Sequence, residues 1–135
     1  MNDQELLAGF RRSKLDAFPH EDHLRVAYLL VREHGETRGA QEFVRGLRRL
    51  AYRFGALPFM LHMTRTKAWI KLIAGEIDDP GQTSAQFLGT HPHLRRKDLL
   101  DDYYTRGRLN SLRARIRFIE GNRKPLPVPV PAASS

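Results

Sequence analysis

The chain of 135 residues has no cysteine, which excludes disulfide frameworks, thiol nucleophiles and cysteine-ligated zinc sites. It also has no apolar run near the roughly 18 residues that a membrane-spanning helix needs. Residues 1–5 lack the basic and apolar stretches of a signal peptide. These absences predict a cytoplasmic protein that does not contact membranes.

Several catalytic signatures are missing too. No serine lies in a Gly-x-Ser-x-Gly context, and no glycine-rich loop resembles a phosphate-binding cradle. The helical zinc signature His-Glu-x-x-His does not occur either. These absences set aside serine hydrolases and P-loop proteins, and they weaken the case for a helical metal site.

The hydrophobic pattern is helical. No run of four β-branched residues precedes the C-terminal tail, and apolar residues recur at three- and four-residue spacing. A hydrophobic fraction of 41% is enough for one modest core. The sequence therefore predicts an all-α protein, a single compact bundle of about five helices over residues 1–120. Residues 121–135 are expected to form a Pro-rich extended tail, because alternate prolines fix φ and remove backbone donors.

Capping residues and turns mark the ends of several expected helices. Asn2 is a candidate N-cap for the first helix, and Gly35 suits the C-terminal end of the second. In the last helix, the spacing of Leu112, Ile116 and Ile119 predicts that these side chains face the core. The five main helices are expected over residues 3–16, 20–34, 37–54, 59–77 and 111–119, with two further short helices at 84–88 and 97–104 in a loop-rich segment.

The formal net charge of +8 makes an anionic partner one hypothesis. Much of the excess lies between residues 95 and 124, which hold ten basic and four acidic side chains. One alternative function is therefore a nucleic-acid-binding module that uses this C-terminal region. An Arg-rich solvated surface explains the same residues without any partner. The basic residues concerned are Arg95, Arg96, Lys97, Arg106, Arg108, Arg113, Arg115, Arg117, Arg123 and Lys124.

Two segments at the starts of helices, residues 18–28 and 62–69, concentrate side chains that can carry chemistry. At about 100° per residue, His20 and His23 lie on one side of their helix. His62 shares a side with Thr66 and Trp69 on the other helix. If the two helices pack face to face, we expect these five side chains to line one small pocket.

Three uses of the histidines remain open at this stage. They can transfer protons, since imidazole titrates near neutral pH. They can ligate a divalent metal, although such spacing often arises by chance. They can also be structural, capping helices and bonding to core carbonyls. We take His20, His23 and His62 as candidate catalytic residues, and we expect neither a metal nor another cofactor.

Further candidates concern substrate binding. Arg25 and Arg65 can hold a carboxylate or phosphate through paired hydrogen bonds. Tyr104 is a candidate for the pocket rim, with a core position as its alternative. The full set of expected substrate-binding residues is Arg25, Tyr28, Arg65, Thr66, Trp69 and Tyr104.

The same two segments resemble a family of small bacterial proteins with a Phe-x-His-x-Asp-His-x-Arg-x-Ala-aromatic element and a His-x-Thr-x-Thr-x-Ala-Trp element. Weaker likeness continues over residues 99–127. Within that set the chain is similar to the small Pictet–Spenglerases of streptonigrin- and lavendamycin-type alkaloid pathways. The residues that carry the likeness are Phe18, His20, Asp22, His23, Arg25, Ala27 and Tyr28, then His62, Thr64, Thr66, Ala68 and Trp69.

The resemblance implies an enzyme that joins an indole amine to an aldehyde and so builds a β-carboline without a cofactor. Such a reaction needs a base to remove the ring proton, and His62 or His23 has the chemistry for it. Trp69 and Tyr28 can stack an indole. Small-molecule substrates are thus the expected partners, nucleic acid is the alternative, and the oligomeric state is open, a homodimer included.

Overall fold

The computed structural model describes residues 1–55 and 61–128, and within them the chain is helical and has no strand. Two short 3-10 helices supplement the α-helices, η2 at Pro92–Arg95 and η3 at Leu99–Asp102. The α-helices are α1 (Asp3–Arg11), α2 (His20–His34), α3 (Glu36–Arg53), α4 (Met63–Glu76), α5 (Ser84–Thr90), α6 (Arg106–Leu109) and α7 (Leu112–Ile116).

Local sequence explains where the first helices begin and end. Asn2 caps α1 in a reciprocal capping box. The Asn2 side chain accepts a hydrogen bond from the Glu5 backbone N–H, and the Glu5 carboxylate accepts one from the Asn2 backbone N–H. Gly35 ends α2 with φ of 83°, a conformation that favours glycine. Both expected caps are confirmed, and the expected bounds of α2 are the observed ones.

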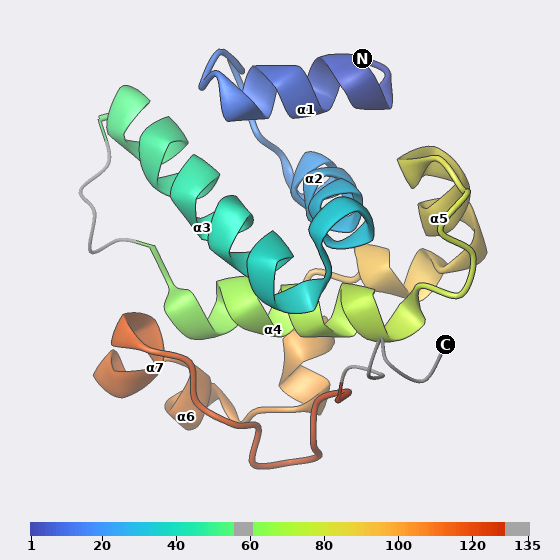
Figure 1. Ribbon diagram of the computed structural model, residues 1–135. Coiled ribbons are helices and arrows are strands. Elements are labelled where there is room, and N and C mark those ends of the chain that lie inside the picture. The colour runs from blue at the N-terminus through green and yellow to red at the C-terminus, as the bar shows by residue number, and fades with distance from the viewer. Residues whose placement is uncertain (56–60, 129–135) are drawn as a thin grey trace.

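Helix α2 lies at the centre of the bundle, with α1 across one side and α5 on another (Figure 1). Helices α3 and α4 pack on it as a pair. They come together where the Lys71 ammonium bonds the Glu36 carboxylate at 3.1 Å, and they separate towards the C-terminal end of α3 (Figure 1). This divergence leaves room between the two helices beside the start of α2.

The C-terminal part of the described chain packs under α4 through small and polar contacts. Ala114 is fully buried, so α7 approaches α4 closely. The Thr64 hydroxyl donates to the Arg117 carbonyl at 2.9 Å and accepts from the Ile119 amide at 3.2 Å. Leu126 is buried too, and it anchors the start of the Pro-rich segment on the body.

The expected all-α bundle is confirmed, but the first helix ends at Arg11 rather than at residue 16, and further differences lie in the C-terminal third. Leu112 and Ile116 are 72% and 67% exposed, so the prediction that they face the core is wrong. Helix α7 packs against α4 through the side that carries the small residue Ala114 instead. The expected 97–104 helix is a 3-10 turn, and α6 was not expected. Residues 129–135 of the expected tail, and the first two residues of the expected 59–77 helix, lie outside the described residues.

Among the described residues, no helix combines the length and apolar character that crossing a membrane requires.

A glycine in the middle of α3 is required by close packing. A Cβ atom at Gly46 would lie 2.2 Å from the Phe10 ring. Phe10 is 1% exposed and packs near Phe18 and Phe43, so its ring has no space to move into.

We expect Gly46→Ala to lower the free energy of unfolding by about 1–3 kcal/mol, because overpacking outweighs the helix propensity gained. Gly89→Ala in α5 is the matched control, since a Cβ there meets nothing within 4 Å. That variant should be neutral or slightly stabilising. Urea denaturation followed by circular dichroism measures both, and equal effects would contradict the packing argument.

Candidate functional site

A cavity of about 280 Å³ lies between α3 and α4 at the N-terminal end of α2. It is near the lower limit of ordinary ligand pockets and mostly apolar, with a few polar side chains on its wall. The lining residues are His20, His23, Leu24, Ala27, Phe43, Leu47, Leu61, His62, Arg65, Thr66, Trp69 and Ile73.

The expectation that the starts of the two helices meet at one pocket is therefore confirmed. All five residues predicted to line one pocket border this cavity, and Arg65 borders it too. The cavity's apolar wall from α3 was not anticipated as a binding surface. Phe43 and Leu47 carry the spacing of any buried helical stripe, so the sequence held no signal that separates a cavity wall from solid core.

His20 lies with its ring edge-to-face against Trp69, at 5.1 Å between centroids. Its buried Nε2 has no hydrogen-bond partner among the described residues. Burial lowers the pKa of His20, and the Leu94 backbone carbonyl only partly opposes this. His20 is therefore a neutral imidazole at pH 7, and one of its nitrogens is not used by the described part of the protein.

His23 stacks on Phe18 at 4.1 Å between ring centroids and meets the Phe43 ring at its edge. These neighbours exclude water, and burial lowers the pKa of His23 to about 4. The nearby His20 lowers it further, while the Phe18 carbonyl acts in the opposite direction. His23 is thus neutral throughout the physiological range and can act there only as a base or hydrogen-bonding group.

His62 has a different role, because both of its ring nitrogens are used. It is the N-cap of α4, with Nδ1 accepting from the Arg65 amide at 3.1 Å. An accepting Nδ1 requires the proton to be on Nε2, which donates to the Leu109 carbonyl at 2.7 Å. Burial lowers the pKa of His62 and favours this neutral form. The geometry therefore supports the structural alternative for this residue.

Thr66 and Arg65 supply the remaining polar character of the cavity. The Thr66 hydroxyl donates to the His62 carbonyl at 2.8 Å, so it offers a ligand only its lone pairs. Arg65 borders both the cavity and a neighbouring polar hollow, which Lys97 and Asp101 also line. A ligand with an apolar body and an anionic end could therefore lie in the cavity and reach the Arg65 guanidinium.

Three expected substrate-binding residues lie elsewhere. Arg25 ties α2 to its neighbours, donating to the Ser84 hydroxyl at 2.8 Å and to the Asp3 carboxylate at 3.1 Å. Tyr28 is fully buried against Phe87 and is not part of the cavity wall.

The Tyr28 hydroxyl donates to the Gln82 carbonyl at 2.7 Å, and Tyr104, also fully buried, donates to the Ile119 carbonyl at 2.6 Å. Arg25, Tyr28 and Tyr104 therefore do not border the cavity, and for Tyr104 the core alternative is the position observed. Each of these side chains is directed to a partner that only the folded chain brings near, and each stabilises the scaffold.

Within residues 1–55 and 61–128, no group of three His, Asp or Glu side chains is placed to hold a metal ion. The metal alternative required the three imidazoles to converge on one ion. The His62 imidazole caps α4 and the His23 imidazole packs against Phe18 and Phe43, so the three imidazoles are not arranged around one ion.

In comparisons with known proteins, no family model, no curated protein and no solved structure matches this chain.

The capping role of His62 leads to a stability prediction. His62→Ala should lower the free energy of unfolding by about 2 kcal/mol, because it removes the cap and the bond to Leu109. His62→Asn retains a good capping side chain and should lose only about 1 kcal/mol. Urea denaturation measures both variants. If the two are equally destabilised, the cap is not what His62 supplies.

Burial of His23 leads to a pH prediction. The unfolded chain binds a proton at this site below about pH 6.5, whereas the folded chain does so only near pH 4. Protonation of this site in the unfolded chain should therefore lower folding stability by about 2 kcal/mol between about pH 7 and pH 5, in addition to the loss from His20 and His62, whose pKa values burial also lowers. His23→Gln should remove most of this loss, and His34→Gln, at the other end of α2, should retain it. An unchanged pH dependence in His23→Gln would contradict the burial argument.

Proposed function

We propose that the cavity binds a small aromatic molecule and that the protein catalyses its condensation or cyclisation, with a neutral imidazole as the base. The observation that carries this proposal is the pairing of His20 and His23 on the wall of one apolar cavity that Trp69 also lines. The resemblance of residues 18–28 and 62–69 to Pictet–Spenglerases supplies the reaction class.

The reaction balances without an oxidant or another co-reactant. An indole amine and an aldehyde form an imine with loss of water, and a proton taken up from solvent converts the imine to an iminium ion. Carbon 2 of the indole attacks the iminium carbon, which forms the new ring. Loss of the proton from carbon 2 then restores the aromatic ring and gives a tetrahydro-β-carboline.

The two cavity imidazoles suit the last step better than His62 does. His23 and His20 are neutral at pH 7, so each can accept the proton that leaves the ring. The His20 ring borders the cavity and its Nε2 has no hydrogen-bond partner among the described residues, whereas both nitrogens of His62 are occupied. We therefore assign the base to His20 or His23 and the positioning of the start of α4 to His62.

Binding would draw on the aromatic wall and on one cation. Trp69 offers a ring surface to the indole, and Arg65 offers a guanidinium to its carboxylate. Holding the two reactants together in a small cavity would supply much of the acceleration.

Occupancy can be measured directly, because Trp69 is the chain's single tryptophan. Titration with a nitroindole, whose own emission is weak, should quench Trp69 fluorescence saturably. Leu47→Phe adds bulk to the cavity wall without adding a second tryptophan and should abolish saturation. Absence of saturable quenching in the unaltered protein would show that the cavity does not accept an indole.

Turnover is tested by incubating the protein with tryptophan and short aldehydes and separating the product enantiomers. We expect one enantiomer in excess, and we expect His20→Gln or His23→Gln to lower the rate about 100-fold. His34→Gln, which alters a histidine outside the cavity, should leave the rate within about twofold. A racemic product formed at the buffer rate would refute the proposed reaction.

A further inference from the structure

The charge of the chain is segregated around α3 and α4. Residues 37–75 contain eight Lys and Arg residues but only one acidic residue, Glu42. The sequence segments on either side, residues 1–36 and 76–94, hold five basic and ten acidic residues. A positive surface thus exists apart from the basic C-terminal region that the sequence first suggests.

Helix α3 divides its side chains between two opposite faces. Phe43, Leu47 and Leu50 are buried, and the first two line the cavity. The opposite side is exposed and basic. We call it the α3 basic face, and it consists of Arg45, Arg48, Arg49 and Arg53.

The α3 basic face is only partly neutralised by carboxylates. Arg45 lies 3.6 Å from Glu42, and Arg53 lies 3.5 Å from the fully exposed Asp16. Pairs this exposed contribute little and are easily exchanged for another anion. Arg48 and Arg49 form no ion pair with any described residue.

Hollows border the α3 basic face on both sides. One, of about 470 Å³, lies between α3 and the start of α4 and includes Lys67. The other, of about 500 Å³, is a shallow depression at the end of α3 that includes Tyr52 and Ser13. Arg48 and Arg49 line both hollows, so the two form one basic track along the helix.

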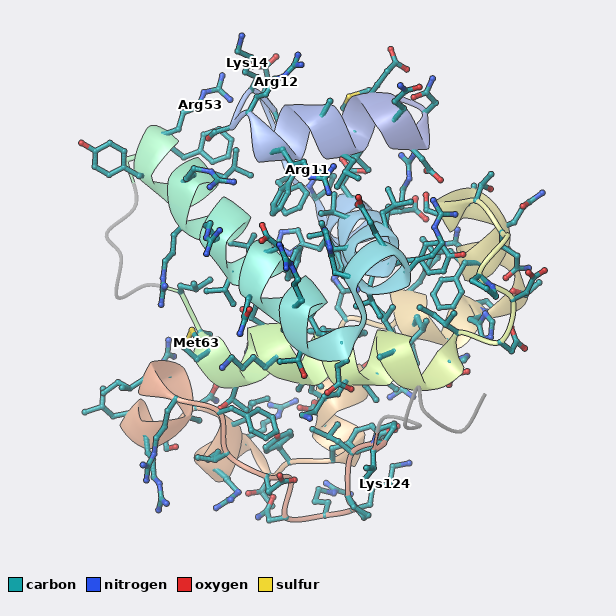
Figure 2. The ribbon with its side chains drawn as sticks, viewed as in Figure 1. Arg11, Arg12, Lys14, Arg53, Met63 and Lys124 are labelled. Atoms are coloured by element: carbon teal, nitrogen blue, oxygen red, sulfur yellow. The ribbon has the colours of Figure 1, made fainter. Side chains whose placement is uncertain are left out.

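The end of this track carries exposed aromatic rings. Tyr52 is 81% exposed and Phe54 is 51% exposed. The Arg53 guanidinium lies 5.8 Å from the centre of the Phe54 ring. Figure 2 shows Arg53 at the same end of the molecule as Arg12 and Lys14, which extend the positive charge beyond α3.

We propose that the α3 basic face binds the phosphates of single-stranded nucleic acid, with a base stacked on Tyr52. A basic track that follows a phosphate backbone, joined to exposed rings on which bases stack, is the combination that single-strand binding requires. Phosphate alone would explain the arginines but not the exposed tyrosine. This surface is on the opposite side of α3 from the cavity, so the proposal is independent of the proposed enzymatic function.

The basic C-terminal region fits such a partner less well. Arg95 lies 2.7 Å from Glu21, and Arg96 lies within 3.3 Å of both Asp98 and Asp102. Carboxylates thus stand beside both of these arginines, whereas none pairs with Arg48 or Arg49 among the described residues. Helix α7 exposes Leu112 and Ile116 beside its arginines and contains no aromatic residue, whereas the α3 basic face lies beside the exposed Tyr52 ring.

The test is fluorescence anisotropy with labelled oligo-dT and oligo-U of about 20 nucleotides, longer than a typical single-strand site. We expect binding at low salt, with a log–log salt slope of about −2 to −3 for three or four phosphate contacts. Arg48→Gln with Arg49→Gln should reduce the slope by about 1.4. Tyr52→Ala should weaken binding about tenfold.

The matched control is Arg123→Gln with Lys124→Gln, which removes the same charge far from Arg53 (Figure 2). Its affinity should stay within about twofold of the unaltered protein. If both double variants bind the oligonucleotide equally weakly, net charge alone explains the loss of affinity and the proposal is overturned. Absence of binding at low salt, no effect of Tyr52→Ala, or a duplex that binds as tightly as the single strand would also overturn it. All substituted side chains are exposed, and circular dichroism confirms folding.

Discussion

Helix α2 is buried along almost its whole length, and that burial requires neighbouring helices on every side. Its residues from Val26 to Val31 all lie in the core, so α1, α3, α4 and α5 each cover part of one helix. Helices α3 and α4 separate towards the C-terminal end of α3 (Figure 1), and a cavity lies between them at the start of α2. Because His20 and His23 occupy that start, the same packing that forms the core places two imidazoles on the wall of this cavity.

Three histidines that look alike in sequence thus have different physical roles. His62 is held by hydrogen bonds at both nitrogens and determines where α4 begins. His23 is held by aromatic stacking, and His20 has a nitrogen without a partner among the residues described. Burial lowers the pKa of all three, so the site has neutral bases but no ready acid. Neutral imidazoles fit the role of base that we propose for His20 or His23.

Helix α3 connects the two surfaces for which we propose functions. Its inner side supplies the cavity wall, and its outer side supplies the α3 basic face. The close contact between Gly46 and Phe10 fixes the helix against α1, so both surfaces are held in a rigid frame. Substitutions on the outer side leave this contact intact, which allows the two proposed functions to be separated experimentally.

Sequence alone determined the local features, because capping and periodicity depend on residues only a few positions apart. It predicted the bounds of α2, the Asn2 cap and the convergence of His20, His23, His62 and Trp69. It could not determine the partners of side chains that bond over long distances in the chain. Arg25, Tyr28 and Tyr104 bond to Ser84, Gln82 and Ile119, and Leu112 is exposed because Ala114 fits more closely against α4. These outcomes were decided by tertiary packing, since a hydrogen-bond partner or a buried face exists only after distant segments have come together.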